Sequence, residues 1–593
     1  VIVARKRVRA SMLAARACLL TLTTLAVPAQ APRLLHNHLG FEPDQTKVFL
    51  LEAPAKGPRP SFEVVDARGV VVDRGTFQAA QSVDRWHLGP YFRAEVRTLR
   101  REGIYRLRVR RGSLRLEGQP FEVRSRLLPE TLLSDMLFHF KGQRSSGTVD
   151  RADRAMTFHG GRPGTVDVSG GWYDASGDVS KYLSHLNYTN TMCPQQAPMT
   201  TWALLEGAER LAQAPSPALK ALAPRFREEA LHGADWLVRM QDPEGYFYTT
   251  VFDVWSKDLS RRSICAYRTQ DGHKLTSYQA AYREGGGLAI AALARASRFV
   301  AEGAFGPARY LEAAEKGFAH LEARNLEYCD NGTENLLDDY AALMAATELH
   351  RATGRSTFLE AARRRAVRML ERQATSGPWP GHFQVDDEGT PYFHGAEAGL
   401  PVVALLRYHG AEPEAGRRER IRAAVEAYLR FELKVAAEVP NPFGLARQVV
   451  QGVGEAPRSA FFLPQRNASG YWWQGENARL ASLACAARWA APLLPDLAEA
   501  LRRHAERQVD WILGCNPYDM CMLQGRGRNP AVYTPEYPNA PGGICNGITG
   551  GVGNERDLAY MPQPQAGDPA QNWRWSEQWG LHPTWLCLAL LAP

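Results

Sequence analysis

The sequence contains few cysteines and, after residue 31, no long apolar run, and both shortages narrow the possible classes of protein. Nine cysteines are scattered over 593 residues without a CxxC pair, which argues against a zinc ribbon. No later apolar stretch is long and charge-free enough to predict a transmembrane helix. No G-x-S-x-G, P-loop or dinucleotide fingerprint precedes a suitable helix, which argues against lipase, kinase and dehydrogenase classes.

A strong excess of charge is also missing. The chain has 71 basic and 63 acidic residues and a formal net charge of +8. Arginine-rich segments such as 416–422 are interleaved with acids and apolar positions, so they indicate solvated helix faces and not a nucleic-acid site. Hydrophobic residues make up 45% of the chain, which is typical of a globular protein with a sizeable core.

The first 31 residues have the pattern of a signal peptide. Basic residues at 5–9 precede the apolar run CLLTLTTLAV (18–27), and AQA (29–31) is a small-residue cleavage pattern. The run is too short to span a bilayer. We therefore expect export to the periplasm or medium, where a disulfide among the clustered cysteines Cys515, Cys521 and Cys545 would be permitted.

Residues 32–127 are predicted to form a small all-β domain. Segments such as YFRAEVRTL and GIYRLRVRRGSLRLEGQPFEV alternate apolar and polar residues at period two, with turns about every ten residues. This spacing is typical of a β-sandwich.

From about residue 130 the apolar period changes to 3.6, and residues 128–593 are predicted to be mainly α-helical. One helix is expected to begin near 130, and the others are expected at 200–212, 226–241, 285–300, 308–324, 336–353, 358–374, 395–410, 417–438, 475–491, 495–514 and 583–592. About a dozen helices without a fixed sequence repeat favour a closed double ring, an α/α toroid, with loops building one face. A plain helical bundle is the alternative.

The segment DVSGGWYDASGDVSKY (167–182) places Asp174 and Asp178 in a glycine-rich, aromatic setting. Glycosidic bond hydrolysis needs two carboxyl groups on opposite sides of the scissile bond, and such a loop could present one of them. Ordinary turn formation by Asp and Gly is an equally good account of the segment alone.

A second carboxyl group with a suitable setting is Glu577, in NWRWSEQWGLHP (572–583). A general acid needs a raised pKa to keep its proton near neutral pH, and flanking tryptophans can desolvate it. The competing account is a glutamate at a helix entry, stabilised by the helix dipole, with the tryptophans in the core.

The sequence resembles glycoside hydrolase family 9. DVSGGWYDASGDVSKY is similar to that family's signature DVSGGWYDAGDxxKY, and YREGGGLAIAALARAS, NLLDDYAALM, YWWQGENARLASLA and DWILGCNP follow in the family's order. The resemblance implies an (α/α)6 barrel, preceded by an immunoglobulin-like module, and an inverting mechanism. It implies that Asp178 is the general base, that Asp174 helps to position the attacking water, and that Glu577 is the general acid.

Three departures from the family pattern concern the sugar-binding face. Ser176 adds a residue between the two aspartates, so either of them could hold the water. The loop 525–551 has no histidine where many members carry a PHHR block, and Glu577 lies in WSEQW instead of the common NEVA context. These departures suggest that the fold and the reaction are retained while the sugar subsites are altered.

The leading functional hypothesis is an inverting glycoside hydrolase that cleaves cellulose-like β-1,4-glucans or their oligosaccharides. An exo-acting β-glucosaminidase or β-glucosidase on short oligosaccharides is the alternative, and a non-catalytic carbohydrate-binding toroid is a third hypothesis. We expect Glu577 to face Asp174 or Asp178 across a groove, with the carboxyl groups roughly 6.5–9.5 Å apart. The expected groove-lining aromatics are Trp172, Tyr173, Tyr471, Trp472 and Trp575.

No cofactor is expected to be required, and no metal site is predicted. Structural calcium is conceivable at LEYCDNGTENLLDDY (326–340), although a helix cap formed by Asp and Asn is the simpler account. His394 and Glu397 would need a third ligand to hold a metal, so a hydrogen bond at a helix entry is preferred. The expected partner is a β-linked oligo- or polysaccharide, with neither nucleic acid nor a membrane span, and the protein is expected to be a monomer.

Overall fold

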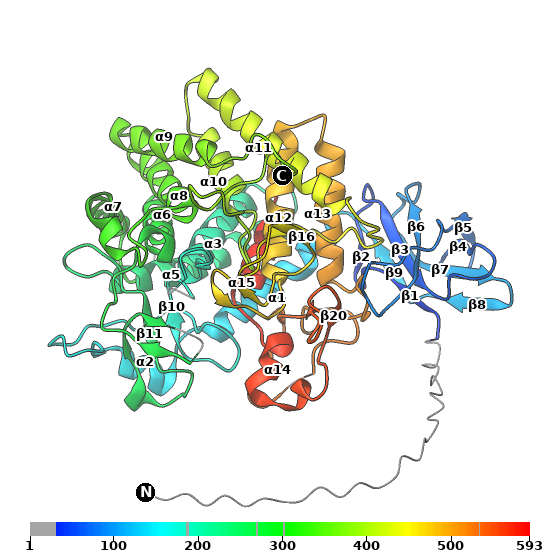
Figure 1. The fold of residues 1–593 in the computed structure, drawn as a ribbon, viewed down its shortest axis with the longest axis horizontal. Helices are drawn as coiled ribbons and strands as arrows, with labels where there is room; N and C mark the ends of the chain where they lie inside the picture. Colours follow the sequence, from blue (N-terminus) through cyan, green and yellow to red (C-terminus); the bar gives the residue numbers. More distant parts are fainter. Residues whose placement is uncertain (1–30, 186–188, 269–270, 301–302, 533, 593) are drawn as a thin grey trace, which may run out of the picture.

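The structure is a computed structural model that describes residues 31–592 except 186–188, 269–270, 301–302 and 533. Residues 1–30 of the expected signal peptide lie outside this range. The described chain has a strand-rich region followed by a larger helical body, and Figure 1 shows the strands on one side of that body, beside helix α13.

The strand-rich region is a sandwich of two sheets. One sheet has the order β1-β3-β6, and the other has the order β2-β9-β7-β4-β5, with β8 paired to β7. The strands are β1 (Arg33–Leu35), β2 (Gly40–Phe41), β3 (Lys47–Glu52), β4 (Ser61–Asp66), β5 (Val71–Thr76), β6 (Tyr91–Val96), β7 (Gly103–Arg111), β8 (Leu114–Glu117) and β9 (Phe121–Val123). This arrangement confirms the β-sandwich that the alternating pattern predicts.

Strand β3 explains how the sandwich attaches to the helical body. All of its residues are buried, although a strand with one solvated face would alternate. Phe49 and Leu51 belong to the core of the sandwich, whereas Val48 and Leu50 belong to the core of the helical body. Because successive side chains of a strand point to opposite faces, β3 contributes to both cores at once.

The helical body is a double ring of helices. The inner helices are α3 (Ala197–Ala212), α6 (Gly286–Ala296), α8 (Leu336–Thr353), α10 (Leu400–His409), α12 (Asn477–Ala490) and α15 (Leu581–Leu590), and each contacts the next until α15 contacts α3. The outer helices are α1 (Leu127–Gln143), α5 (Ala223–Arg239), α7 (Pro307–Tyr328), α9 (Ser356–Glu371), α11 (Ala415–Ala436) and α13 (Ala498–Ile512). Inner and outer helices alternate along the chain, so this is the (α/α)6 toroid, and the plain bundle is excluded.

Burial distinguishes the two rings. Every residue of α6 is buried, as expected for a helix with neighbours on all sides. Gly287 shows how tightly the inner ring is packed, because a Cβ atom built there would lie 2.7 Å from the Cβ atom of Ala341 in α8. Outer helices such as α13 instead bury one face and expose the other.

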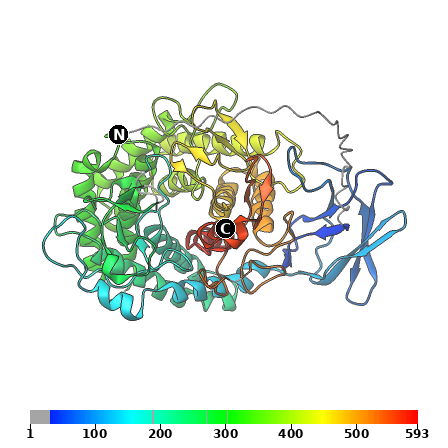
Figure 2. The same cartoon turned by 60° about the horizontal axis from the view of Figure 1, so that its bottom comes forward.

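Short elements occupy the loops between the helices. They are the helices α2 (Gly147–Asp153), α4 (Pro217–Lys220) and α14 (Pro569–Ser576), and the strands β10 (Lys181–Tyr182), β11 (Thr250–Phe252), β12 (Ser263–Ile264), β13 (Tyr267–Arg268), β14 (His273–Lys274), β15 (Gln448–Val450), β16 (Arg458–Ala460), β17 (Arg466–Asn467), β18 (Gly470–Tyr471), β19 (Thr549–Gly550) and β20 (Leu558–Ala559). Figure 2 shows α15 surrounded by the other helices of the body.

Candidate active site

A cleft of about 670 Å³ opens among the loops that lead into the inner helices. Its lining includes Asp174, Asp178 and Glu577 together, although about four hundred residues of chain separate the aspartates from the glutamate. The other residues that line it are Gly177, His185, Trp255, Lys257, Tyr267, Asp271, Trp472, Trp473, Gln474, Glu536, Tyr537, Ala570, Gln571, Trp573, Arg574 and Trp579. Helices α3, α12 and α15 each begin shortly after one of these segments.

Asp174 is held in place by two side-chain donors. Its Oδ1 atom accepts hydrogen bonds from the indole Nε1 of Trp579 at 2.9 Å and from the side-chain amide of Gln196. Burial raises the pKa of the Asp174 carboxyl, and the two hydrogen bonds partly offset that rise because they favour the ionised form.

Asp178 has fewer donors and more negative neighbours. Its Oδ1 accepts a hydrogen bond from the backbone N–H of Ser180 at 2.8 Å. Burial raises the pKa of Asp178, and the nearby carboxylates of Asp174 and Asp253 raise it further. The Ser180 hydroxyl donates to Asp253 Oδ1 at 2.6 Å, so a third acid lies directly behind the pair.

Glu577 follows the last residue of helix α14 and is partly exposed in the cleft. Its backbone oxygen accepts from the N–H of Asn546 at 2.8 Å, and its Oε2 lies 3.4 Å from the donating side-chain nitrogen of the same residue. Burial, together with the charges of Asp174 and Asp178, raises the pKa of Glu577 well above its ordinary value. The Asn546 amide is oriented by His582, whose ring lies 2.8 Å from its Oδ1.

Two of the five aromatics expected in the groove lie in the core, and for these two the expectation is wrong. Trp575 is fully buried, donates to Thr549 at 3.0 Å and packs edge-on against Trp473. Trp172 is also buried, with its indole N–H donating to Glu229 at 2.8 Å. Neither ring has a free face for a sugar.

The other three expected aromatics have different positions. Trp472 lines the cleft, and its buried indole nitrogen has no hydrogen-bond partner among the described residues. Tyr173 does not line the cleft, and its hydroxyl accepts from the N–H of Ser146 at 3.1 Å. Tyr471 is also outside the cleft lining and packs under Arg574.

The structure adds residues to the cleft that the sequence analysis missed. Trp255, which is 37% exposed, stands edge-on to Phe252 and Tyr267 and is the most exposed tryptophan in the cleft lining. An isolated tryptophan in the polar segment FDVWSKD (252–258) could have indicated a sugar-binding residue from the sequence alone. No sequence pattern distinguished His185, which lies 3.7 Å from Asp174 Oδ2. Because burial lowers the pKa of His185 to about 4, its ring is neutral near pH 7.

The backbone around Trp255 is strained. Val254, Trp255 and Lys257 all have positive φ angles, which is rare for residues with a side chain and especially for a β-branched valine. Asp253 supports this turn by accepting from the N–H of Lys257 at 2.6 Å. Strain of this kind concentrates at functional sites, where the surrounding structure holds it in place.

Within the described ranges, no group of three or more His, Cys, Asp or Glu side chains is placed so that it could hold a metal ion. In the segment proposed for calcium, Asn335 caps helix α8 by accepting from the N–H of Leu337 at 2.9 Å. His394 Nδ1 accepts from the N–H groups of Ala396 and Glu397, which is a hydrogen bond before a helix. Helix α10 begins at residue 400 and not at 395.

Cys515, Cys521 and Cys545 are buried, and no disulfide forms among these three. Within the same residues, no helix is long and apolar enough to cross a membrane.

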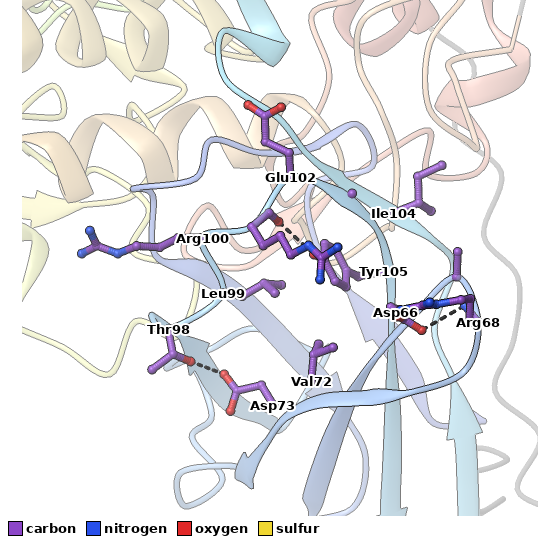
Figure 3. A pocket seen from close by; sticks show the side chains of 13 residues that line it. Asp66, Arg68, Val72, Asp73, Thr98, Leu99, Arg100, Glu102, Ile104 and Tyr105 are labelled. Atoms are coloured by element: carbon purple, nitrogen blue, oxygen red, sulfur yellow. Dashed lines mark hydrogen bonds and ion pairs between the residues drawn. The ribbon is translucent and has the colours of Figure 1, made fainter.

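A second hollow, of about 570 Å³, lies on the sandwich (Figure 3). Its acids already have local partners, because Asp66 accepts from the backbone N–H groups of Arg68 and Val70, and Thr98 donates to Asp73. The pKa of Asp66 is lowered by these hydrogen bonds. This hollow therefore lacks the protonated, partly buried acid that distinguishes the cleft.

Comparisons with known proteins agree with this geometry. The family model described as glycosyl hydrolase family 9 matches residues 130–538. Endoglucanase 15 of Arabidopsis thaliana is 26% identical over 447 residues, which cover 69% of this chain and 76% of the plant protein.

Solved structures match over nearly the whole chain. A metagenome-derived family 9 endoglucanase is 20% identical, with a TM-score of 0.65 over 94% of this chain and 98% of its own. A Bacteroides ovatus protein described as GH9 is 18% identical, with a TM-score of 0.64 and the same coverage. At these identities the likeness establishes the fold, and it includes the strand-rich region as well as the toroid.

Proposed function

The chain belongs to glycoside hydrolase family 9, and from that premise we propose that its cleft hydrolyses β-1,4-linked glucan chains with inversion. Glu577 is the general acid in this proposal, Asp178 is the general base, and Asp174 positions the attacking water. The plant relative and the metagenomic neighbour are both named endoglucanases, which supports a glucan substrate. The family match ends at residue 538, so the role of Glu577 rests on its place in the cleft.

The observation that carries the proposal is one cleft containing a carboxylic acid and a carboxylate pair. The pKa of Glu577 is raised well above its ordinary value, so this side chain keeps a proton that it can donate. Asp174 is stabilised as an anion by Trp579 and Gln196, and its charge raises the proton affinity of Asp178. A base whose pKa approaches the working pH is the more effective acceptor.

The reaction follows from these positions. Glu577 gives its proton to the glycosidic oxygen as the bond from that oxygen to C1 breaks. A water molecule attacks C1 from the opposite side, and Asp178 accepts the proton that this water loses. The new sugar end has the inverted configuration, and proton exchange with solvent restores both carboxyl groups. The spacing expected for such a pair, with room for one water, stays a prediction.

The walls of the cleft are suited to sugar rings. Trp255 and Trp573 are partly exposed and offer apolar faces on which a pyranose can stack. Trp472 also lines the cleft, with a small part of its ring exposed there. We propose these three residues as substrate contacts, in place of Trp172 and Trp575.

A second candidate substrate is an amino sugar at a chain end, as in glucosamine oligosaccharides. The favouring observation is the charge of the cleft, where Asp271 and Glu536 add two exposed acids to the three central carboxyl groups. A surplus of acids attracts a cationic amine. Lys257 and Arg574 are the basic residues of the same lining.

We further propose the organisation expected from the sequence. Residues 1–31 act as a signal peptide for export, 32–127 form the sandwich module, and 128–593 form the catalytic toroid, which needs no cofactor. We propose that the protein acts as a monomer.

The test is a reducing-sugar and product-anomer assay with cello-oligosaccharides, mixed-linkage glucan, xylan and chitosan oligomers. We expect the inverted anomer from a glucan substrate, and loss of about 10²- to 10⁴-fold in kcat for Glu577→Gln. Glu499→Gln, at a surface glutamate 71% exposed, is the matched control and should retain full activity. Hydrolysis only of chitosan oligomers would favour the second candidate, and activity that survives in Glu577→Gln would refute the assignment of the acid.

A further inference from the structure

The loop of the two aspartates is joined to the loop of the glutamate by a short antiparallel pairing. The N–H of Ser176 donates to the backbone oxygen of Gln578 at 2.9 Å, and the N–H of Gly580 donates to the backbone oxygen of Asp174 at 3.2 Å. Next to the first of these bonds, the N–H of Gln578 donates to the hydroxyl oxygen of Ser176 at 2.9 Å. A serine side chain therefore takes the place of a backbone acceptor.

A third loop is attached at the same point. The side-chain amide of Gln578 accepts from the N–H of Ala540 at 2.8 Å and donates to its oxygen at 2.9 Å. The Ser176 hydroxyl also donates to Asn539 Oδ1 at 3.3 Å. Asn539 in turn donates to the backbone oxygen of Ser576 at 2.9 Å, immediately before Glu577.

Close packing supports these hydrogen bonds. Gly177 has a φ of 86°, and a Cβ atom built there would lie 2.3 Å from the backbone oxygen of Glu536. The loop that carries Glu536 and Tyr537 into the cleft therefore rests directly on the chain between Asp174 and Asp178. Ser176 itself is 2% exposed, so water does not compete for its hydroxyl.

We propose that Ser176 is a positioning residue that, through Gln578, sets the distance between Asp178 and Glu577. Ser176 lies two residues before Asp178, and Gln578 directly follows Glu577, so a hydrogen bond between them fixes both acids relative to each other. Ser176, the residue that lengthens the spacing between the two aspartates, thus supplies the hydrogen bond that joins their loop to the loop of Glu577. This inference rests on the catalytic roles proposed above.

The first test is Ser176→Ala. This change leaves the buried N–H of Gln578 without its acceptor and loosens the joined loops. We expect kcat to fall on the order of 10- to 100-fold, as is typical when reacting groups are misplaced by about an ångström, while KM changes less than about twofold. Ser176→Thr keeps a hydroxyl and should recover most of the lost kcat.

The pH profile gives a readout that a purely structural role would not change. The charges of Asp174 and Asp178 help to raise the pKa of Glu577. If the loops separate in Ser176→Ala, that influence weakens, and the basic limb of the kcat/KM profile should move to lower pH. The same limb should return toward the wild-type position in Ser176→Thr.

Ser482→Ala is the matched control. Ser482 is another buried serine, whose hydroxyl oxygen accepts from the N–H of Gly399 at 3.1 Å and whose hydroxyl donates to the oxygen of Arg479 at 2.8 Å. It does not line the cleft. Its loss should lower the unfolding midpoint while kcat and the pH profile stay as in the wild type.

A second variant, Ser176→Cys, replaces the hydroxyl that Gln578 N–H binds with a weaker acceptor of similar size and should reduce kcat by a smaller factor. This variant keeps the proposal testable if Ser176→Ala does not fold. Wild-type kcat and an unshifted basic limb in whichever of the two variants fold would overturn the inference, provided that Glu577→Gln is inactive in the same assay. An inert wild-type protein over the whole substrate panel would instead refute the proposed function.

Discussion

Two groups of buried or half-buried carboxyl groups lie toward opposite ends of the inner helices, and they differ in the charge of their neighbours. The cleft group, Asp174, Asp178 and Glu577, lies at the loops that precede α3 and α15 and faces other acids and aromatic rings. The network group, Glu206 and Glu348, lies toward the C-terminal ends of α3 and α8 and faces arginines.

The network group is closely paired. Arg295 lies 2.6 Å from Glu206 Oε2 and 3.4 Å from Glu348 Oε1, and Arg407 lies 2.7 Å from Glu348 Oε1. Burial would raise the pKa of Glu348, but the guanidinium groups of Arg407 and Arg295 outweigh it and lower the pKa to about 2. Glu206 responds in the same way, also to about 2.

The comparison teaches that burial of an acid does not by itself indicate catalysis. What matters is whether the neighbours favour the ionised or the protonated form. In the network the arginines keep the glutamates ionised, which makes them part of the framework. In the cleft the charges of Asp174 and Asp178 oppose the ionisation of Glu577, which keeps its proton available for the reaction.

The largest expected effect that tests this difference between the two groups is the loss of stability in Glu348→Gln. This change leaves Arg295 and Arg407 buried without a full charge partner, so we expect the unfolding free energy to fall by about 3–5 kcal/mol at pH 7. Urea unfolding measures this loss, and kcat per folded molecule should be unchanged. Glu577→Gln should show the opposite behaviour, with activity lost and no fall in unfolding free energy. Equal stability of Glu348→Gln and the wild type would contradict the argument.

The two groups should also affect the pH dependence of the unfolding free energy in opposite directions. The folded pKa of Glu206 and Glu348 is lowered from 4.5 to about 2, so each stabilises the fold above pH 4.5 and loses that effect as pH falls toward 2. Each loss is on the order of 2–3 kcal/mol.

The cleft acids have raised pKa values, so their contribution has the opposite sign and stability declines as pH rises from about 4 toward neutrality. Unfolding free energies measured at pH 3, 5 and 7 test both slopes. The loss between pH 5 and pH 3 should be smaller in Glu348→Gln, and an unchanged loss would show that the network does not cause it.

The smallest expected effect concerns two tryptophans, Trp255 in the cleft and Trp575 in the core. Trp255→Ala removes a stacking face from the cleft, so KM should rise roughly 5- to 10-fold, equivalent to about 1–1.5 kcal/mol, with little loss of stability. Trp575→Phe, at a fully buried ring, should lower the unfolding midpoint and leave KM unchanged. A KM that responds to Trp575 and not to Trp255 would reverse the assignment of the two rings.

Much of the fold was predictable because it depends on repeating patterns. The helices predicted at 336–353 and 475–491 are observed as Leu336–Thr353 and Asn477–Ala490. The helix predicted at 395–410 begins at Leu400, and residues 395–399, which include the poor helix formers Gly395 and Gly399, form bends and a turn. An apolar period does not reveal such local backbone preferences.

The candidate site was predictable in part. Asp174, Asp178 and Glu577 were found from the glycine- and tryptophan-rich segments around them and from a family resemblance. The error over Trp172 and Trp575 has a plain cause, because proximity to an acid in the sequence does not say toward which side a ring points. Asp253, which hydrogen bonds to Ser180 behind Asp178, had no distinguishing signal.

The sequence by itself determined where apolar residues recur every second position, in the sandwich, and where they recur every 3.6 positions, in the toroid. It also determined the residue types that the chemistry requires. Periodicity and composition are local properties, so a linear pattern can carry them. Only the tertiary structure decided that Ser176 meets Gln578, that Trp255 faces the cleft, and that Glu348 is paired with arginines while Glu577 is not. These outcomes depend on which distant segments come together, and closing the ring of helices brings them into contact.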